Sequence, residues 1–151
     1  MTPQEQTPRI ASARPEMTRV IMAETGLDEN VLRELVHRFY AKVREDTFLG
    51  PIFASRIADW APHMERMVAF WSSVALMTGR YHGRPVPAHT PLPIDAAHFD
   101  RWLALFRATA REVCPAAGAE HVIERAERVA RSLQISVGEV SAGPDAAPAL
   151  R

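Results

Sequence analysis

The sequence predicts an all-α fold with one domain. Apolar residues recur at helical spacing in four long stretches, Gly and Pro gather between them, and no alternating pattern is long enough to predict a sheet. A chain of 151 residues is long enough for a single domain with a substantial buried core. We expect this domain to span residues 22–138. Residues 1–21 and 139–151 show no convincing period, so we expect them to be largely flexible.

The first helix is predicted over residues 28–44. Asp28 is a suitable N-cap, because its carboxylate can accept a hydrogen bond from a main-chain N–H of the first turn. The helix carries an apolar stripe, with Tyr40 beside it: Leu32, Leu35, Val36, Phe39 and Val43. The helix should end before Leu49-Gly50-Pro51-Ile52-Phe53, where Gly and Pro interrupt the pattern. Phe53 is expected to return to the core.

The second helix is predicted over residues 59–77, and Pro62 is tolerated there because it falls in the first turn. Five residues at helical spacing share one face of this helix: His63, Met67, Phe70, Trp71 and Val74. This face therefore turns His63 toward the core. Residues 78–93 contain six Gly and Pro residues, so at most one helical turn is expected there, around His89.

Two more helices complete the predicted fold, over residues 95–114 and 118–137. The first has an apolar stripe that includes Phe99, Trp102, Leu103 and Phe106. The second has a corresponding stripe of Val122, Ala126, Val129 and Leu133. Its charged residues are spaced for two ion pairs, Glu124 with Arg128 and Glu127 with Arg131.

Composition argues against several classes of partner. The chain has 18 basic and 18 acidic residues, so it lacks the basic surplus that favours nucleic acid or an anionic membrane. No apolar run approaches the roughly 20 residues that span a bilayer. The N-terminus is polar and does not resemble a signal peptide. The single cysteine, Cys114, excludes an internal disulfide and fits a reducing compartment, so we expect a cytoplasmic protein.

Four separated residues suggest a haem pocket when they are taken together. A ferrous haem needs one imidazole below the iron, polar hydrogens above it and apolar walls that exclude water. His89 lies in a short, proline-stiffened segment between two long helices, and His63, Tyr40 and Trp102 lie on apolar helices. Each residue alone has an ordinary structural explanation: a loop histidine, a hydrogen-bonded core histidine, a tyrosine at the core rim and a packing tryptophan.

Seven segments in the same order closely resemble the third group of bacterial truncated haemoglobins. The resemblance extends over residues 28–133, which is most of the predicted domain. The segments are Phe39-Tyr40, Leu49-Gly50-Pro51-Ile52-Phe53, Trp60-Ala61-Pro62-His63, Phe70-Trp71-Ser72-Ser73, Tyr81-His82-Gly83-Arg84-Pro85, Ala88-His89-Thr90-Pro91-Leu92-Pro93 and His98-Phe99-Asp100-Arg101-Trp102-Leu103. The resemblance implies a shortened, two-over-two helical sandwich that binds haem b, iron protoporphyrin IX.

The resemblance also implies a role for each of these residues. His89, in the matching Pro-x-x-x-His-x-x-Leu-Pro stretch, would be the proximal iron ligand. Tyr40 and Trp102 would donate hydrogen bonds to iron-bound oxygen, and His63 would be a gate or a third polar group. Phe53 would pack on the porphyrin.

Three further residues of the second predicted helix belong to the implied cofactor site, and a fourth, Arg66, is a candidate. Met67, Phe70 and Trp71 would contact the haem from the face that they share with His63. Arg66 either pairs with a haem propionate at the pocket mouth or is an ordinary solvated arginine on the helix surface.

Two good donors imply slow release of oxygen, because a hydrogen bond to a charged acceptor contributes roughly 1.5–3 kcal/mol, or about one to two decades in rate. Such binding favours chemistry or sensing over bulk oxygen transport. The implied ligands are O2, NO, CO or peroxide. A nitric oxide dioxygenase or a peroxidase-like activity is compatible with the pocket, and turnover would need a reductase of unknown identity.

Two alternatives do not involve haem. One is a helical protein whose histidines bind a divalent metal, but the histidines are scattered and form no Cys-x-x-Cys or His-x-x-x-His pair. The other is a cofactor-free bundle that binds a partner helix. A haem absorbance band distinguishes both from the haem protein.

Overall fold

The computed structural model describes residues 12–81 and 94–141, with the side chains up to residue 135. Regular secondary structure in these ranges is entirely helical, as expected. None of the described helices is both long and apolar enough to cross a membrane. The helices are α1 (Pro15–Thr25), α2 (Glu29–Glu45), α3 (Gly50–Arg56), α4 (Trp60–Leu76), α6 (Ala96–Val113) and α7 (Ala116–Ser141).

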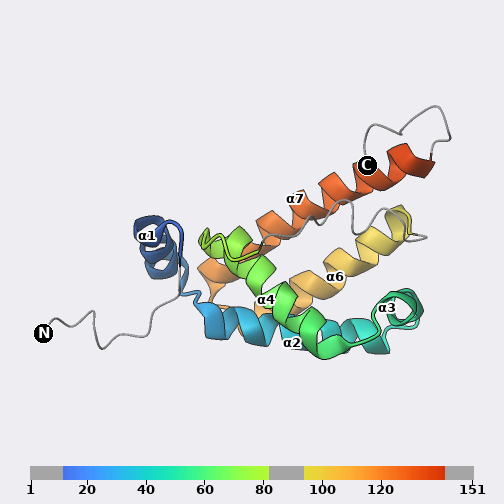
Figure 1. Cartoon of the computed structure of the whole chain (residues 1–151), viewed down its shortest axis with the longest axis horizontal. Helices are drawn as coiled ribbons and strands as arrows, with labels where there is room; N and C mark the ends of the chain where they lie inside the picture. Colours follow the sequence, from blue (N-terminus) through green and yellow to red (C-terminus); the bar gives the residue numbers. More distant parts are fainter. Residues whose placement is uncertain (1–11, 82–93, 142–151) are drawn as a thin grey trace, which may run out of the picture.

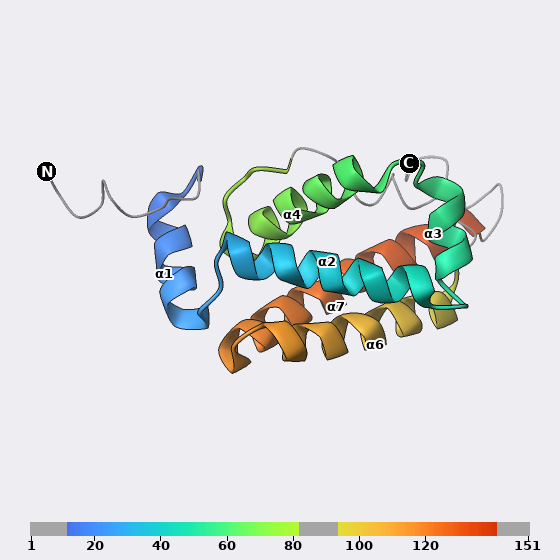
Figure 2. The same cartoon turned by 90° about the horizontal axis from the view of Figure 1, so that it is seen from below.

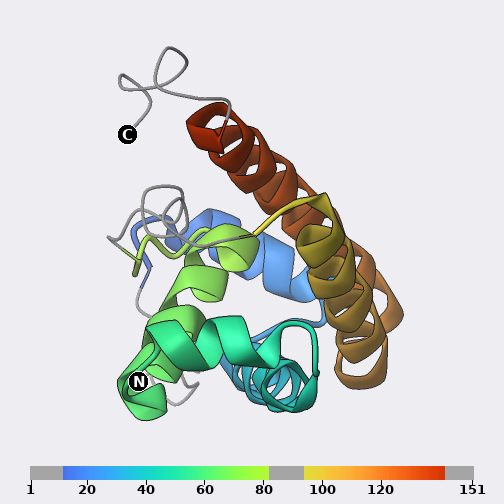
Figure 3. The ribbon, with the colours of Figure 1, turned by 90° about the vertical axis from the view of Figure 1, so that its right-hand side faces the viewer.

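The four long helices form two antiparallel pairs, α2 with α4 and α6 with α7 (Figure 1). Figure 3 shows the pair α6 and α7 on one side of the domain and the pair α2 and α4 on the other. The short helices α1 and α3 lie at opposite ends of α2 (Figure 2). This arrangement is the two-over-two sandwich that the sequence predicted, and the space between its layers is where the candidate site lies.

Three aspartates start the long helices where the sequence predicted. The Asp28 carboxylate accepts a hydrogen bond from the Val31 N–H at 2.9 Å, and the Asp59 carboxylate accepts one from the Ala61 N–H at 3.3 Å. Asp95 accepts from the Ala97 N–H at 3.0 Å. These bonds satisfy main-chain donors that the first helical turn leaves without partners, which is why the predicted and observed starts agree within one residue.

Part of residues 1–21, which we expected to be largely flexible, is helical, because helix α1 begins at Pro15. The helix begins with Pro15 and ends at Thr25, and the next residue, Gly26, adopts φ of 73° and donates its N–H to the Met22 carbonyl. Its Thr18 side chain donates to the Leu76 carbonyl at 2.7 Å. This contact and the burial of Ile21 tie α1 to the domain, so the folded unit begins before residue 22.

Two other boundaries differ from expectation. The Gly-Pro break after α2 is present, but the chain then forms the short helix α3, with Pro51 in the first turn. Helix α7 starts at Ala116 and extends to Ser141, beyond the predicted residues 118–137.

Of the two ion pairs predicted on α7, Glu124 does pair with Arg128, whereas Glu127 pairs across the helix interface with Arg107 at 2.8 Å.

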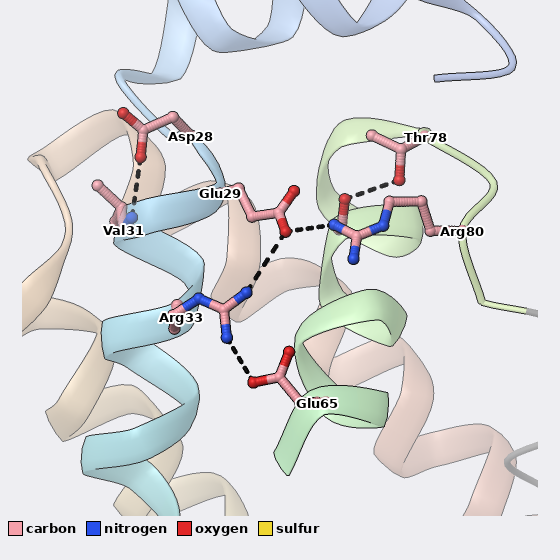
Figure 4. A network of polar contacts seen from close by, with 8 residues as sticks. Asp28, Glu29, Val31, Arg33, Glu65, Thr78 and Arg80 are labelled. Atoms are coloured by element: carbon pink, nitrogen blue, oxygen red, sulfur yellow. Dashed lines mark hydrogen bonds and ion pairs between the residues drawn. The ribbon is translucent and has the colours of Figure 1, made fainter. Parts of the chain in front are cut away.

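A charged network joins the start of α2 to α4 and to the chain that follows α4 (Figure 4). Arg33 pairs with Glu29 at 3.6 Å and with Glu65 of α4 at 2.5 Å. Glu29 also pairs with Arg80. Because the Glu29 and Arg80 side chains are only 22% and 31% exposed, this pair is less screened than an ordinary surface ion pair. The network holds residues 78–81 against the two helices.

Candidate functional site

A cavity that is partly open to solvent lies between α2, α4, α6 and α7, with about 730 Å³ of empty space when the adjoining open solvent is included. Its walls are largely aromatic and aliphatic, and the lining residues with polar side-chain atoms are Tyr40, Tyr81, His98 and Trp102. Such a space suits a mostly apolar ligand that is oriented by a few polar groups. The lining residues are Tyr40, Leu49, Phe53, Met67, Phe70, Trp71, Tyr81, Ile94, His98, Phe99, Trp102, Val129, Ala130 and Leu133.

Tyr40 is buried on α2, with 5% of its surface exposed. Its ring makes edge contacts with Phe39 and Phe53, at centroid distances of 5.0 and 6.1 Å. Burial raises the pKa of the Tyr40 hydroxyl far above its ordinary value, and the charge of Tyr81 raises it further. The hydroxyl therefore keeps its proton at neutral pH and can donate a hydrogen bond.

His63 lies beside Tyr40 at the start of α4. The two rings meet edge to face at 5.3 Å, and His63 also meets Trp60 in the same way at 5.6 Å. The Arg44 guanidinium lies 4.5 Å above the Trp60 ring. Among the described residues, those that line the cavity include Tyr40 but not His63. The position of His63 is therefore next to the cavity wall.

Trp102 is held on the cavity wall by a group of aromatic rings. Its indole stacks on Phe106 at 5.6 Å with the planes tilted by 16°, and Phe39 meets it edge to face at 5.4 Å. Phe106 also stacks on Trp71 at 4.8 Å. Phe39 and Phe106 are each 1% exposed, so the rings that orient the indole are themselves part of the core.

The other predicted cofactor contacts divide into three sets. Phe53, Met67, Phe70 and Trp71 line the cavity, as expected from the shared face of α4 and the return of Phe53 to the core. Arg66 is exposed on α4 and does not belong to the described cavity lining. His89 lies outside the described residues.

Several lining residues were not predicted as site residues. Tyr81, His98 and Phe99 stand in segments that carried the family resemblance, so their place in those segments was an available signal. Val129 and Leu133 belong to the apolar stripe of α7, which predicted only helix packing. Leu49 also stands in one of those segments, whereas Ile94 and Ala130 are ordinary apolar residues that only the tertiary arrangement brings to the cavity.

Comparison with known proteins identifies the family. The profile of the bacterial-like globins matches residues 21–135. The chain is 31% identical over 113 residues to a group 3 truncated haemoglobin of Campylobacter jejuni, a match that covers 72% of this chain and 89% of that protein. The chain belongs to the group III truncated haemoglobins. This truncated haemoglobin is also 28% identical over 84 residues to a group 2 truncated haemoglobin of Bacillus subtilis, covering 54% of this chain and 64% of the relative.

Solved structures agree with the family assignment. The crystal structure of the group III truncated haemoglobin from Campylobacter jejuni matches with a TM-score of 0.70 and 30% identity, over 74% of this chain and 91% of that one. A thermostable haemoglobin from the actinobacterium Thermobifida fusca matches with a TM-score of 0.59 and 28% identity, over 70% of this chain and 89% of that one. Both matches cover most of the helical domain.

The residues of the cavity fit the cofactor that the family implies. Truncated globins bind haem and diatomic gas ligands. Family membership therefore argues against the two alternatives without haem, a helical protein that binds a divalent metal and a cofactor-free bundle. A porphyrin is a large, flat, apolar ring with carboxylates at one edge. The cavity of this truncated haemoglobin offers apolar and aromatic walls, two donors from Tyr40 and Trp102, and a half-buried histidine, His98. These groups suit such a ligand, and the proximal histidine that the family resemblance implies, His89, lies outside the described residues.

Proposed function

We propose that this truncated haemoglobin holds haem b in the cavity, with His89 as the proximal iron ligand, and binds dioxygen and other diatomic ligands beside Tyr40 and Trp102. One observation carries the proposal: a largely apolar cavity has a buried phenol and a fixed indole on its wall. When bound, the haem supplies a ferrous iron that can accept a diatomic ligand. The protein supplies orientation, hydrogen bonds and exclusion of water.

The walls would hold the porphyrin mainly by burial and dispersion. Phe53, Met67, Phe70 and Trp71 present aromatic or thioether surface to the cavity. Apolar burial stabilises a bound ligand by about 25 cal/mol per Å², and aromatic contacts add to this. These walls also keep water away from the reacting side of the cofactor.

Tyr40 and Trp102 would stabilise a bound ligand that carries partial negative charge, as dioxygen does on ferrous haem. The protonated Tyr40 hydroxyl and the Trp102 indole N–H are both donors, and core rings hold both in place. Each hydrogen bond to a charged acceptor contributes about 1.5–3 kcal/mol. Release would therefore be slow. Slow release supports NO dioxygenation, peroxide chemistry or ligand sensing over bulk oxygen transport, with an external reductase where turnover needs electrons.

His63 would act through Tyr40 or as a third polar group. Its ring lies 5.3 Å from the Tyr40 ring and outside the described cavity lining. This location supports a gating role at the wall more than permanent contact with a ligand. Arg66 would reach a propionate only from its exposed position on α4.

An absorbance spectrum tests the proposal. The purified protein, titrated with haem, is expected to develop a Soret band that saturates at one haem per chain, with the spectrum of a histidine-ligated haem. His89→Ala should lose that ligation. His37→Ala, which changes an exposed histidine of α2, is the matched control and should keep it. Absence of a Soret band in the native protein, or unchanged histidine ligation in His89→Ala, would contradict the proposal.

A further inference from the structure

His98 occupies a distinct position on the cavity wall, in the first turn of α6. It is one of the lining residues, yet 16% of its side chain remains exposed. Its ring stacks on Phe48 at 4.2 Å with the planes only 4° apart, and Phe48 is 44% exposed. Trp102 lies one helical turn further along the same face. His98 therefore stands where the cavity wall meets solvent.

The hydrogen bonds of the His98 ring bear on which of its two nitrogens carries a proton. Nδ1 lies 3.1 Å from the Asp95 main-chain nitrogen and 3.0 Å from its carboxylate. When Nδ1 accepts from the Asp95 N–H, the neutral ring carries its proton on Nε2. A protonated ring that donates from Nδ1 to the Asp95 carboxylate also keeps a proton on Nε2. Both arrangements make Nε2 a donor, whereas a neutral ring with its proton on Nδ1 would lose the bond from the Asp95 N–H and leave Nε2 an acceptor.

We propose that His98 is a positioning residue that donates its Nε2–H to a carboxylate of the cofactor in the cavity. This inference rests on the proposed haem site and assigns its carboxylate edge. A histidine that lines an apolar cavity and keeps 16% of its side chain exposed suits a ligand with an apolar body and an anionic edge, as the haem propionates provide. The N-terminus of α6 adds favourable dipole charge at the same place.

The nearby arginines are not available to take the place of His98 as the donor to a carboxylate. The Asp95 carboxylate is 73% exposed and caps the helix through the Ala97 N–H. Arg101, one turn on, is bound to Asp46 at 2.6 Å, and Arg66 stands outside the described cavity lining. Among the described lining residues, His98 and Trp102 carry side-chain nitrogens and are partly exposed, and His98 is the one in the first turn of α6.

A pair of variants separates this role from the structural role of His98 in the helix cap. Glu and Gln at this position can both accept from the Asp95 N–H and so preserve the capping box. Only Gln retains an N–H donor, and Glu adds a charge that repels a carboxylate. We would load native protein, His98→Gln and His98→Glu with haem and follow haem loss to an excess acceptor globin by Soret absorbance. Apoprotein melting curves check that both variants fold.

The expected haem loss from His98→Glu is about tenfold to a hundredfold faster than from native protein, while His98→Gln stays within about threefold. With haem dimethyl ester, which lacks the carboxylates, the difference between the two variants should largely disappear. Equal loss from both variants, or an equal difference with the ester, would overturn the inference. So would loss of histidine ligation in His98→Gln, because it would place His98 on the iron. Failure of the haem site itself is recognised separately, since native protein would then show no Soret band.

Discussion

The indole of Trp102 stacks on the ring of Phe106, with centroids 5.6 Å apart and planes tilted by 16°. Phe106 is 1% exposed and lies in the core, where it also stacks on Trp71 of α4. The donor on the cavity wall is therefore oriented by the interface between helices. A substitution in that interface should therefore alter the rate of ligand release, even when the substituted residue does not contact the ligand.

Phe106→Leu should accelerate oxygen release although Phe106 is not a cavity-lining residue. Loss of the aromatic stack removes about 0.5–1.5 kcal/mol that fixes the indole, so we expect dissociation about twofold to tenfold faster. Flash photolysis or stopped-flow mixing measures the rate. Ile123→Val, a core change expected to cost about 0.5–1.5 kcal/mol of stability, is the control for destabilisation alone. If both variants release oxygen at the native rate, Phe106 does not position the indole.

The folded protein should lose stability at acid pH because of Asp46. Its carboxylate is 5% exposed and accepts hydrogen bonds from the Leu49 N–H at 2.9 Å and from Arg101 at 2.7 Å. Burial alone would raise the pKa of Asp46, but the hydrogen bonds from Arg101 and the main chain, with the Arg101 charge, lower it overall. A lowered carboxyl pKa stabilises the fold above the unfolded-state value of about 3.9, and this stability disappears as pH falls through the folded-state pKa.

Asp46→Asn is therefore expected to melt below the native protein at pH 7, with the gap narrowing below about pH 4. Melting curves over this pH range measure both effects. Asp100→Asn, which changes an exposed carboxylate of α6, should show little change at any pH. A gap for Asp46→Asn that stays constant down to pH 2–3 would show that the Asp46 charge is not the source of the acid sensitivity.

Gly118 permits the close approach of α7 to the chain between α1 and α2. A Cβ at this position would lie 2.8 Å from the Thr25 carbonyl oxygen and 2.8 Å from a Leu27 methyl carbon. Leu27 is 1% exposed, so neither neighbour can move freely. Gly118→Ala should destabilise the fold by about 1–3 kcal/mol, despite the better helix propensity of alanine.

Chemical denaturation measures the Gly118→Ala effect. Glu120→Ala lies on the exposed side of the same helix and is expected to change stability by no more than about 0.5 kcal/mol. A Gly118→Ala protein as stable as the native one would mean that α1 and α7 shift apart at no cost.

The helix starts at Asp28, Asp59 and Asp95 were predictable because each is fixed by a local hydrogen bond. The family resemblance implied that Tyr40, Phe70 and Trp102 belong to one pocket, and all three line the cavity. Helix α1 was missed because its apolar period is short and its stability depends on tertiary contacts such as that of Thr18 with the Leu76 carbonyl. Pro15 at its start and Gly26 after its end were the local signals that could have located it.

The place of His98 was less predictable from the sequence. Its capping box has a histidine where glutamate or glutamine is usual, so the standard pattern does not match. Its partner in stacking, Phe48, comes from the turn after α2, and the sequence does not show that these two segments meet. Arg66 is exposed on α4, which is compatible with both interpretations of the sequence, a propionate partner at the pocket mouth and a solvated arginine.

The central claim, that Tyr40 and Trp102 hold a ligand bound in the cavity, is tested most directly by the oxygen dissociation rate of the haem-loaded protein. Tyr40→Phe and Trp102→Phe should each release oxygen about tenfold to a hundredfold faster than native protein, because each removes one donor to a charged acceptor. Tyr81→Phe removes a hydroxyl from the same cavity and should leave the rate within about twofold. Native dissociation rates in both Tyr40→Phe and Trp102→Phe would contradict the claim.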